Sequence, residues 1–585
     1  MRLWPFRKQV SAEARTLAPP PLAEAAPADM SRLLRIESDE TRSMEASRGR
    51  LRVMGLSLAL GFAILAGRAV EVAVTGPADA ASPTRQVAAN QTRGDLFDRT
   101  GQVLATTLET HSLYADPALV WDAAETAEML ATVLPDIDVE ALTETLDSRR
   151  RFVWVRRNLT PRQRQAVFAL GLPGLEFRSE PHRVYPRGRL ASHVVGYTNR
   201  DMDGLAGAER AFDSALMSGD GRPVALSIDM AVQFHIDEVL RAAMAEYRAL
   251  AATGIVMNVR TGEILGMVSL PDFDPNRPSD ASPGERLNRA AQSVYEMGST
   301  FKAFTVAVAL EERTATLESR YDARAPLAVG GFEINDYHGE ERWLTVPEIF
   351  THSSNIGSGH MALEVGAEAQ RGFLGDLRLL ERAPIELAES ADPLLPRNWG
   401  PTETVTISYG HGIAVSPIAT IAAFAAIAND GVYVPPTLLP VAADETILGE
   451  RVMRSDVARD VLALMRENVV GGTGGNAEAI GFQVAGKTGT ADKPSRGGYD
   501  TSRLISSFSA IFPANDPQYA ILVLLDEPQM PEPTYLRPTG GRVAAPAVGE
   551  IVARIAPILG VERSNEDPVG RAALVRAALM PEMIP

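Results

Sequence analysis

The chain of 585 residues contains no cysteine, which excludes disulfide bonds, thiolate catalysis and cysteine-ligated metal sites. Lysine is almost as scarce. Of the 57 basic residues only Lys8, Lys302, Lys487 and Lys493 are lysines, and all the others are arginines. A guanidinium stays protonated, whereas a desolvated ammonium can lose its proton and act as a base. A lysine retained in such a chain is therefore a candidate for chemistry that arginine cannot perform.

Positive charge is also in deficit. The chain has 74 Asp and Glu against 57 Lys and Arg, which gives a formal net charge of -17 at pH 7. Because phosphate contacts need a basic face, this balance argues against nucleic acid as a partner. The hydrophobic content of 45% and charged content of 22% are those of a folded protein, and the length allows two to four domains.

Long apolar runs are rare, and the strongest one lies near the start of the chain. Residues 53–67 are 15 consecutive positions without a charge, roughly 22 Å of helix against a bilayer core of about 30 Å. The flanking Arg52 and Arg68 can snorkel, and the apolar run continues to Val74. We therefore predict a single transmembrane anchor over residues 51–74.

The charges around this run predict its orientation. Arg42, Arg48 and Arg50 precede it, whereas basic residues are sparse just after it. The positive-inside rule then places the N-terminus in the cytoplasm and the chain beyond about residue 75 in the periplasm, outside the cytoplasmic (inner) membrane. The alternatives are a buried core helix and a signal peptide cleaved after Ala78-Asp79-Ala80. Polar, Pro-rich flanks disfavour the first, and the long leader disfavours the second.

Composition divides the rest of the chain into segments. Residues 1–50 are Pro-rich without a sustained apolar period, which predicts a flexible cytoplasmic tail. We expect an extracytoplasmic domain of short strands and helices over 75–221, a second domain over 222–560 and a C-terminal tail over 561–585.

The second domain has the pattern of an α+β fold. Two apolar strands within Gly254–Leu270 meet at a turn over residues 260–263, which predicts a hairpin. An apolar-periodic helix is expected from Ser299 to about Glu312. Three strands over 482–491, 506–513 and 519–528 and a closing helix over 543–559 follow much later. This order predicts one antiparallel sheet of about five strands covered by helices.

Two of the four lysines lie in motifs with chemical meaning. Ser299 and Lys302 are three residues apart, so on a helix their side chains share a face. A serine hydroxyl becomes a nucleophile when a base removes its proton, and Lys302 can be that base if burial and a second cation lower its pKa. Lys487 is the candidate for the second cation. By itself, the spacing is far more typical of an N-cap serine and a surface lysine.

The segment Ser353-Ser354-Asn355 is a third candidate element, because it lies between the two lysine motifs. Alone it indicates no more than a helix cap or a turn. Lys487-Thr488-Gly489-Thr490 falls within an apolar strand pattern, where glycine weakens a strand unless something approaches the backbone closely. We expect a peptide substrate, added as a further strand, to make that approach to Gly489.

With these motifs in this order, the chain resembles the class B penicillin-binding proteins, and among them the division-specific FtsI type. The resemblance covers most of the chain after the anchor. Met297 stands where the family often has proline. The segments that carry the resemblance are 93–105, 183–199, 204–216, 288–302, 408–419 and 485–491.

The resemblance implies a fold, a reaction and roles for residues. Residues 75–221 would be the pedestal domain of the dimerisation type, and residues 222–560 the transpeptidase domain. Ser299 would attack the D-Ala–D-Ala bond of a peptidoglycan stem peptide, and an amine of a neighbouring stem would capture the acyl-enzyme during septal wall synthesis. The implied assignments are Lys302 as base, Ser353 as proton relay, Asn355 on the substrate amide, Lys487 as cation, Thr488, Gly489 and Thr490 in substrate binding, and the N–H groups of Ser299 and Thr490 as oxyanion hole.

The resemblance also implies partners. Penicillins and other β-lactams would act as inhibitors, and no metal or organic cofactor is implied. The membrane, a polytopic glycan-polymerising protein and other division proteins are the expected neighbours. The alternatives are an elongation-specific class B protein with the same chemistry, a β-lactamase, which would be smaller, a class A synthase, whose glycosyltransferase signature is missing, and a non-catalytic scaffold of wall synthesis.

Overall fold

The computed structural model describes residues 93–564 except 219–220, 443, 446, 496–497 and 532–535, together with residue 567 and positions 56, 59–63 and 66. The predicted anchor at 51–74 and the predicted tails at 1–50 and 561–585 lie wholly or largely outside these residues. Within the described part of the chain, no helix is long and apolar enough to cross a membrane. The elements named below all belong to one unit, Asn90–Pro585.

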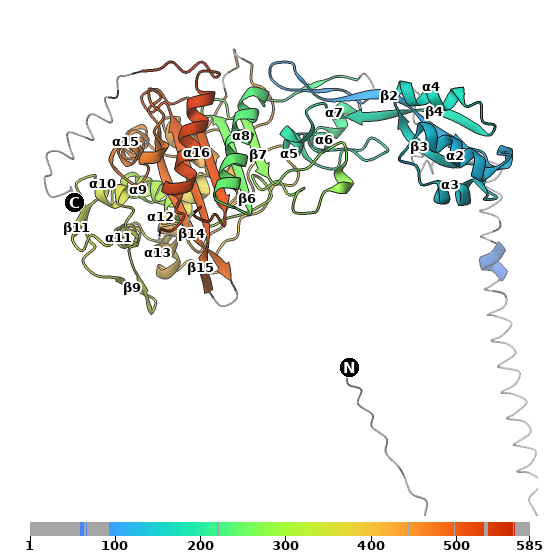
Figure 1. The fold of residues 1–585 in the computed structure, drawn as a ribbon. Helices are drawn as coiled ribbons and strands as arrows, with labels where there is room; N and C mark the ends of the chain where they lie inside the picture. Colours follow the sequence, from blue (N-terminus) through green and yellow to red (C-terminus); the bar gives the residue numbers. More distant parts are fainter. Residues whose placement is uncertain are drawn as a thin grey trace, which may run out of the picture. The chain divides into compact units, whose positions relative to one another are not determined.

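The N-terminal part of this unit is built on a mixed sheet (Figure 1). Helices α2 (Ala123–Val133), α3 (Val139–Leu146) and α4 (Pro161–Ala169) begin after side chains that accept backbone N–H groups of the first turn. Together with the sheet they enclose a small apolar core. The strands are β2 (Val103–Ala115), which pairs antiparallel with β1 (Leu96–Phe97), β3 (Val153–Leu159) and β4 (Leu175–Val184), and β5 (Val224–Ala225), which pairs parallel with β1.

Charged side chains form a buried cluster in this part of the chain. One oxygen of Glu209 accepts from Arg93 Nε at 2.6 Å and the other from Arg183 Nε at 2.7 Å. Arg93 also donates to Asp213 at 2.7 Å. The Arg93 and Glu209 side chains are 0% exposed and that of Arg183 is 2% exposed. The cluster thus joins the three N-terminal segments that carry the resemblance, 93–105, 183–199 and 204–216.

The C-terminal part is built on a five-stranded antiparallel sheet, as the sequence predicts. The predicted hairpin is the pair β6 and β7, and the three late strands complete the same sheet beside β6. Strand β14 lies at one edge, which leaves one side of its backbone without a neighbouring strand. The order is β14 (Ala485–Ser495), β15 (Gly498–Phe512), β16 (Tyr519–Asp526), β6 (Ala251–Asn258) and β7 (Ile264–Leu270).

Each face of this sheet is covered by its own apolar layer. Along β16, Ile521 and Val523 pack in the core that contains α8 (Met230–Glu246) and α16 (Gly540–Ile555), while Leu522 and Leu524 belong to the core on the other face. This alternation follows the two-residue period of a strand. Figure 1 shows α8 and α16 side by side across the sheet.

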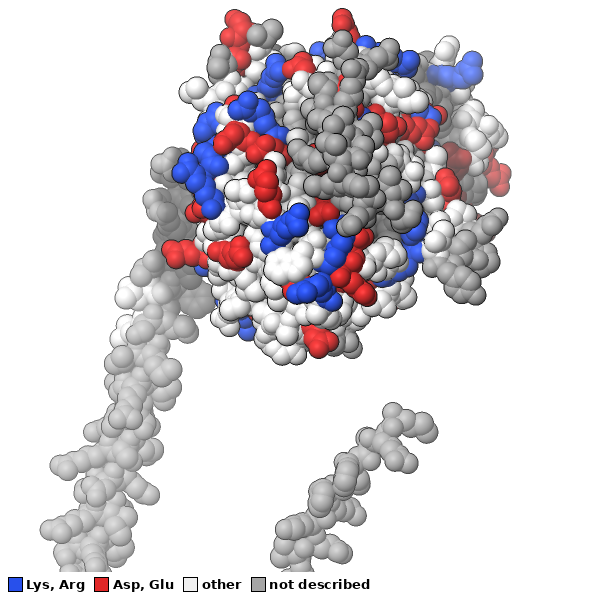
Figure 2. Space-filling view, turned by 90° about the vertical axis from the view of Figure 1, so that its left-hand side faces the viewer, with Lys and Arg blue, Asp and Glu red and all other residues white. Residues whose placement is uncertain are grey.

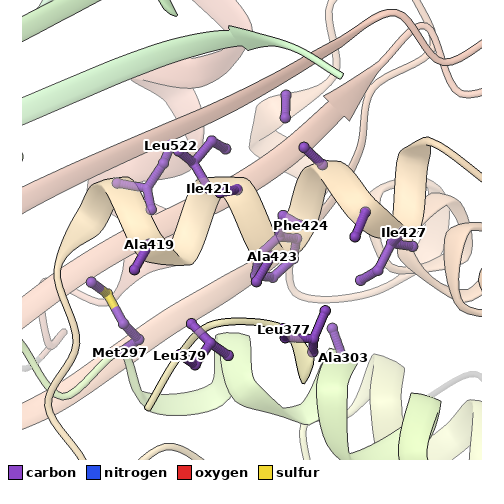
Figure 3. Packing of buried hydrophobic residues seen from close by; sticks show 14 of the residues in the cluster. Met297, Ala303, Leu377, Leu379, Ala419, Ile421, Ala423, Phe424, Ile427 and Leu522 are labelled. Atoms are coloured by element: carbon purple, nitrogen blue, oxygen red, sulfur yellow. The ribbon is translucent and has the colours of Figure 1, made fainter. Parts of the chain in front are cut away.

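Helix α14 (Pro417–Ala428) supports the other face, and all of its residues are buried. In the close-up it runs between Leu522 of β16 and a layer that includes Met297 and Ala303, which flank the candidate nucleophile (Figure 3). The Phe424 ring meets the Phe304 ring edge-on at a centroid distance of 5.1 Å. The apolar helix α14 thus packs between β16 and the segment around Ser299.

The remaining helices and short strands are distributed over both parts of the unit. The predicted helix from Ser299 begins as a 3₁₀ turn, η4 (Gly298–Phe301), and becomes α-helical only at α9 (Lys302–Glu311). The other elements are η1 (Pro117–Leu119), η2 (Gly188–Ala191), α5 (Ser192–Val195), α6 (Gly207–Ala211), α7 (Asp213–Leu216), η3 (Pro278–Asp280), β8 (Arg320–Asp322), β9 (Leu327–Val329), β10 (Phe332–Ile334), β11 (Trp343–Thr345), α10 (Val346–Thr351), α11 (Asn355–Val365), α12 (Ala367–Asp376), α13 (Pro401–Ser408), β12 (Val432–Tyr433), β13 (Glu450–Arg451), α15 (Ser455–Gly471) and η5 (Gly475–Ala477).

Acidic and basic side chains alternate over the face of the molecule that Figure 2 shows. Blue and red side chains lie next to one another among the white ones. Ion pairs are common among the described residues, for example Arg382 with Asp392 at 2.8 Å. The net negative charge is therefore not gathered into one broad patch among the described residues of this face.

Candidate active site

Ser299 and Lys302 meet as their spacing predicts. Lys302 is the first residue of α9, and its Nζ lies 3.1 Å from Ser299 Oγ across the 3₁₀ turn η4. Ser299 is partly exposed, whereas the Lys302 side chain is completely buried. A substrate can thus reach the serine while water is kept away from the amine.

Lys302 also contacts the Ser353–Asn355 segment, which lies in the turn between α10 and α11. Its Nζ lies 3.1 Å from Ser353 Oγ and 2.8 Å from Asn355 Oδ1, and it contacts the Ser353 carbonyl oxygen. With Ser299 this makes four partners. A charged ammonium has three donors and no acceptor. A neutral amine likewise has three hydrogen-bonding positions, and it can donate to the two oxygens that only accept, Ser353 O and Asn355 Oδ1, and use its lone pair for a serine hydroxyl.

The electrostatic surroundings favour this neutral form. Burial lowers the pKa of Lys302 well below its usual value, the charge of Lys487 lowers it further, and the Asp336 carboxylate opposes both effects. Burial also lowers the pKa of Lys487, to about 7. Desolvation is the larger cause in both cases because it disfavours the charged form of an amine. Lys302 is therefore poised to accept a proton.

Lys487 approaches the same serine from strand β14. Its Nζ lies 3.1 Å from Ser353 Oγ and 3.3 Å from Thr488 Oγ1, with the Phe350 ring centroid at 5.6 Å. Ser353 Oγ thus contacts both lysines, 51 residues from one and 134 residues from the other along the chain. The five side chains that the motifs predict to act together, Ser299, Lys302, Ser353, Asn355 and Lys487, form one connected group.

The two threonines of the strand motif lie at its border. Thr488 Oγ1 is 3.0 Å from Thr473 Oγ1, and Thr490 Oγ1 accepts the Gly540 N–H at 3.0 Å. Thr490 is partly exposed and Thr488 is nearly buried. The Thr488 hydroxyl thus contacts both Thr473 and Lys487, whereas the Thr490 hydroxyl has the Gly540 N–H as its contact and keeps hydrogen-bonding capacity for a ligand.

The close approach to Gly489 is made by the chain itself, which differs from the expectation that a substrate requires this glycine. A Cβ atom at Gly489 would lie 2.5 Å from the Met297 carbonyl oxygen and 2.2 Å from Ser507 Oγ. Gly298, at φ +56°, is equally tight, because a Cβ there would lie 2.5 Å from Thr490 O. These glycines let the Ser299 turn sit directly against the backbone of β14.

Lys493 has a different environment from the other two lysines of the domain. Its Nζ pairs with Asp526 Oδ1 at 2.7 Å and Glu527 Oε1 at 2.8 Å, and the side chain is 23% exposed. These contacts place Lys493 outside the catalytic group. It also lines the rim of a cavity of about 320 Å³ formed by residues 294–296, 394–396, 412–414, 491–494 and 505.

Two groups of side chains near the site were not predicted from the sequence. Asp336, from the loop after β10, accepts hydrogen bonds from the Ser354 hydroxyl and from the backbone N–H groups of Asn355 and Ile356. Glu296 accepts from Gly412 N and Tyr499 OH, both at 3.0 Å. No motif marks Asp336, because its role depends on a contact about 20 residues away. Glu296 lies within the segment that resembles the family's nucleophile region.

Comparison with known proteins agrees with this geometry. The family model of the penicillin-binding protein transpeptidase domain matches residues 252–553, and that of the penicillin-binding protein dimerisation domain matches residues 88–222. The probable peptidoglycan D,D-transpeptidase FtsI of Caulobacter vibrioides is 44% identical over 486 residues, which are 81% of this chain and 82% of that protein. The peptidoglycan D,D-transpeptidase FtsI of Escherichia coli is 29% identical over 504 residues, 80% and 84% of the two chains.

A solved structure shares the fold. Penicillin-binding protein 3 from Mycobacterium tuberculosis, in complex with aztreonam, aligns with a TM-score of 0.62 at 24% identity and covers 81% of this chain and 97% of that one. The predicted α+β transpeptidase fold with an N-terminal dimerisation domain is thus confirmed, as is the predicted FtsI type. The chain belongs to the class B penicillin-binding proteins and is an FtsI-like peptidoglycan D,D-transpeptidase.

Proposed function

We propose that Ser299 forms the acyl-enzyme through which this protein cross-links peptidoglycan stem peptides during septal wall synthesis. The observation that carries the proposal is the position of Ser353 Oγ, 3.1 Å from both Lys302 Nζ and Lys487 Nζ, beside a serine that Lys302 also contacts. This arrangement connects nucleophile, base and second cation in one path for a proton.

Acylation begins with proton transfer from Ser299 Oγ to the neutral Nζ of Lys302. The oxygen attacks the carbonyl carbon of the penultimate D-Ala, and a bond forms between Oγ and that carbon. Collapse of the tetrahedral intermediate breaks the D-Ala–D-Ala amide bond. The leaving nitrogen takes a proton that passes from Lys302 through the Ser353 hydroxyl, so D-Ala departs with a neutral amine and Lys302 returns to its neutral state.

The negative oxygen of the intermediate needs hydrogen-bond donors. The backbone N–H groups of Ser299 and Thr490 are the candidates. The contact of Gly298 with Thr490 supports this assignment, because a Cβ at Gly298 would lie 3.1 Å from Thr490 N. The two N–H groups therefore belong to backbone segments in van der Waals contact.

The substrate carboxylate requires a positive partner at the end of the site. Lys487, Thr488 and Thr490 line the same stretch of edge strand β14, and a bound carboxylate would raise the lowered pKa of Lys487 and keep it charged. The free edge of β14 can pair with an extended peptide, whose amide Asn355 would hold. Gly489 contributes by letting the nucleophile turn approach this strand.

Release of the product reverses the proton path. An amine of a neighbouring stem peptide attacks the ester carbon, and its proton moves through Ser353 to Lys302. Breakage of the ester bond returns a proton to Ser299 Oγ and leaves a new amide, which is the cross-link.

Location and partners extend the same proposal. The segment 51–74 would anchor the chain in the cytoplasmic membrane with residues 1–50 inside and the domains at 75–221 and 222–560 outside, followed by the tail at 561–585. The apolar run of residues 53–67 and the arginines before it support this orientation. A polytopic glycan-polymerising protein and other division proteins would be its neighbours.

Labelling with a fluorescent penicillin tests the assignment. The wild-type chain is expected to form a stable adduct that Ser299→Ala does not form, and the label is expected at midcell. An unlabelled wild-type protein would refute the catalytic role of Ser299, and label spread along the side wall would refute the septal role.

A further inference from the structure

We propose that Asp336 is a positioning residue for the reaction, which holds the Ser353–Asn355 turn in register with Lys302. This inference rests on the proposed function. Asp336 lies in the loop between β10 and β11 and takes no part in any motif of the sequence. It contacts neither Ser299 nor Lys302 through a hydrogen bond that the structure records, so it would act through the turn.

Both carboxylate oxygens of Asp336 are used at this turn. Oδ1 accepts the Asn355 N–H and, at 3.0 Å, the Ile356 N–H, while Oδ2 accepts the Ser354 hydroxyl at 2.7 Å. The neighbouring Asn335 carbonyl accepts from Asn355 Nδ2 at 3.1 Å. The amide of Asn355 is thereby oriented with its oxygen toward Lys302.

The turn needs such support because its backbone is strained. Ser353 has φ +62°, a left-handed conformation that is unfavourable for a residue other than glycine. This conformation places both its carbonyl oxygen and its hydroxyl against Lys302 Nζ. The first N–H groups of α11 follow at once and would otherwise lack partners. Asp336 satisfies them and so stabilises the turn that carries two contacts of the base.

The charge of Asp336 acts on the base as well. The charged and titratable groups around Lys302 are Lys487 on β14, Asp336 from the loop after β10, and His411 from the loop after α13. Lys487 lowers the pKa of Lys302 and Asp336 raises it. A helix cap that only stabilised the fold would leave this proton equilibrium unchanged.

Three variants of the full chain separate positioning from stability. Asp336→Ala removes the acceptors and the charge, whereas Asp336→Asn removes the charge and keeps an oxygen that can accept both N–H groups. Asp229→Ala is the matched control, because Asp229 caps α8 by accepting the Ala231 and Val232 N–H groups away from the site. The measurements are the second-order rate of acylation by a fluorescent penicillin against pH, and the thermal midpoint.

We expect Asp336→Ala to slow acylation by about 100-fold, the scale of a displacement of roughly 1 Å at a catalytic group. Asp229→Ala should lower the thermal midpoint by about as much as Asp336→Ala does, but it should leave the acylation rate unchanged. Asp336→Asn should acylate well at neutral pH, and the acid limb of its pH–rate profile should move to lower pH because Lys302 loses a stabilising negative charge.

Two results would overturn the inference. One is a folded Asp336→Ala protein that acylates within about threefold of the wild-type rate. The other is an acid limb that stays in place or moves to higher pH in Asp336→Asn, and this variant decides alone if the alanine protein does not fold. Absence of labelling in the wild-type protein would instead refute the role of Ser299, so the two failures are distinguishable.

Discussion

Single residues decide the chemistry here through their burial. Lys302 and Lys487 are both 0% exposed, whereas Lys493 of the same domain pairs with two carboxylates at the rim. Burial lowers the pKa of the first two, and ion pairing raises that of Lys493. Lys487 and Lys493 lie on the same strand, yet the pKa of the first is lowered and that of the second is raised. Desolvation lowers the pKa of an amine, whereas a nearby carboxylate raises it.

Lys302→Arg should abolish acylation although it keeps the positive charge. Arginine cannot give up its proton at accessible pH, so the general base is lost, and the rate of penicillin labelling should fall by at least about 100-fold. Lys493→Arg is the control, since a guanidinium can also pair with Asp526 and Glu527. Equal labelling of the two variants would contradict the assignment of Lys302.

The pH dependence of acylation should be bell-shaped. Lys302 must be neutral, so the rate should fall as the pH drops below its lowered pKa. Lys487 must be charged to hold the penicillin carboxylate, so kcat/KM should also fall as the pH rises above about 7, the pKa of this residue in the free protein. A profile in which the rate rises steadily from pH 7 to 10 would argue against Lys487 as the carboxylate partner.

Lys487→Met should stabilise the protein while it abolishes acylation. The pKa of Lys487 is about 7 in the folded chain and 10.5 as the ordinary value, so between these pH values the unfolded chain binds the extra proton. Folding is disfavoured at pH 7 by this difference, and stability rises with pH until about 10.5. We expect the variant to gain roughly 1–4 kcal/mol in unfolding free energy at pH 7. Chemical denaturation at pH 7 and pH 10 measures both the gain and its decrease at high pH.

At the scale of elements, the site depends on how closely a turn and a strand approach. The 3₁₀ turn η4 rests on β14 because Gly298 presents no side chain to the Thr490 backbone and Gly489 presents none to the Met297 carbonyl oxygen. The Gly298 N–H also donates to the Gly410 carbonyl at 3.2 Å, which joins a third segment. Contacts between backbones thus hold together the turn that carries Ser299, the strand that carries Lys487 and the loop at Gly410.

Gly489→Ala should damage both stability and acylation. Its Cβ would overlap the Met297 carbonyl oxygen, a backbone atom that cannot rotate away, and the expected loss is about 1–3 kcal/mol or more. The control is Gly372→Ala in α12, where a Cβ meets nothing within 4 Å and should add about 0.5–1 kcal/mol. Thermal unfolding with parallel labelling compares them, and a stable, fully active Gly489→Ala protein would contradict the contact.

At the scale of the whole molecule, the N-terminal part contains a buried cluster of ion pairs. The Glu209 carboxylate accepts from the buried guanidinium groups of both Arg93 and Arg183. Removal of one partner from a buried ion cluster leaves uncompensated charge, which costs more than the pairs contribute. The cluster lies far in sequence from Ser299, so its loss tests whether the two parts depend on each other.

Glu209→Ala should destabilise the N-terminal part by about 3–5 kcal/mol and leave acylation of Ser299 largely intact. Limited proteolysis should then cut between residues 93 and 221 first. Asp136→Ala, which breaks an exposed pair with Arg156 at 3.3 Å, should cost less than about 1 kcal/mol. Loss of penicillin labelling in Glu209→Ala would show instead that the catalytic domain needs the N-terminal part to fold.

Local chemistry could be predicted from the sequence alone. Ser299 and Lys302 meet because they are three positions apart in a helical turn, and the strands β6, β7 and β16 follow from their apolar runs. The scarcity of lysine distinguishes Lys302 and Lys487, whose motifs carry the resemblance to the family. These features depend on neighbours along the chain, which a sequence displays directly.

Only the tertiary structure decided how the base is tuned and held. Ser353 Oγ lies between two lysines that are distant in sequence, and the same packing removes both amines from water. The tertiary structure also explains why position 489 is a glycine, and it supports the role proposed for Asp336. Both depend on segments that are distant in sequence and meet only after folding. The pKa of a side chain depends on its burial and on the charges around it in three dimensions. The spacing of residues along the chain does not contain that information.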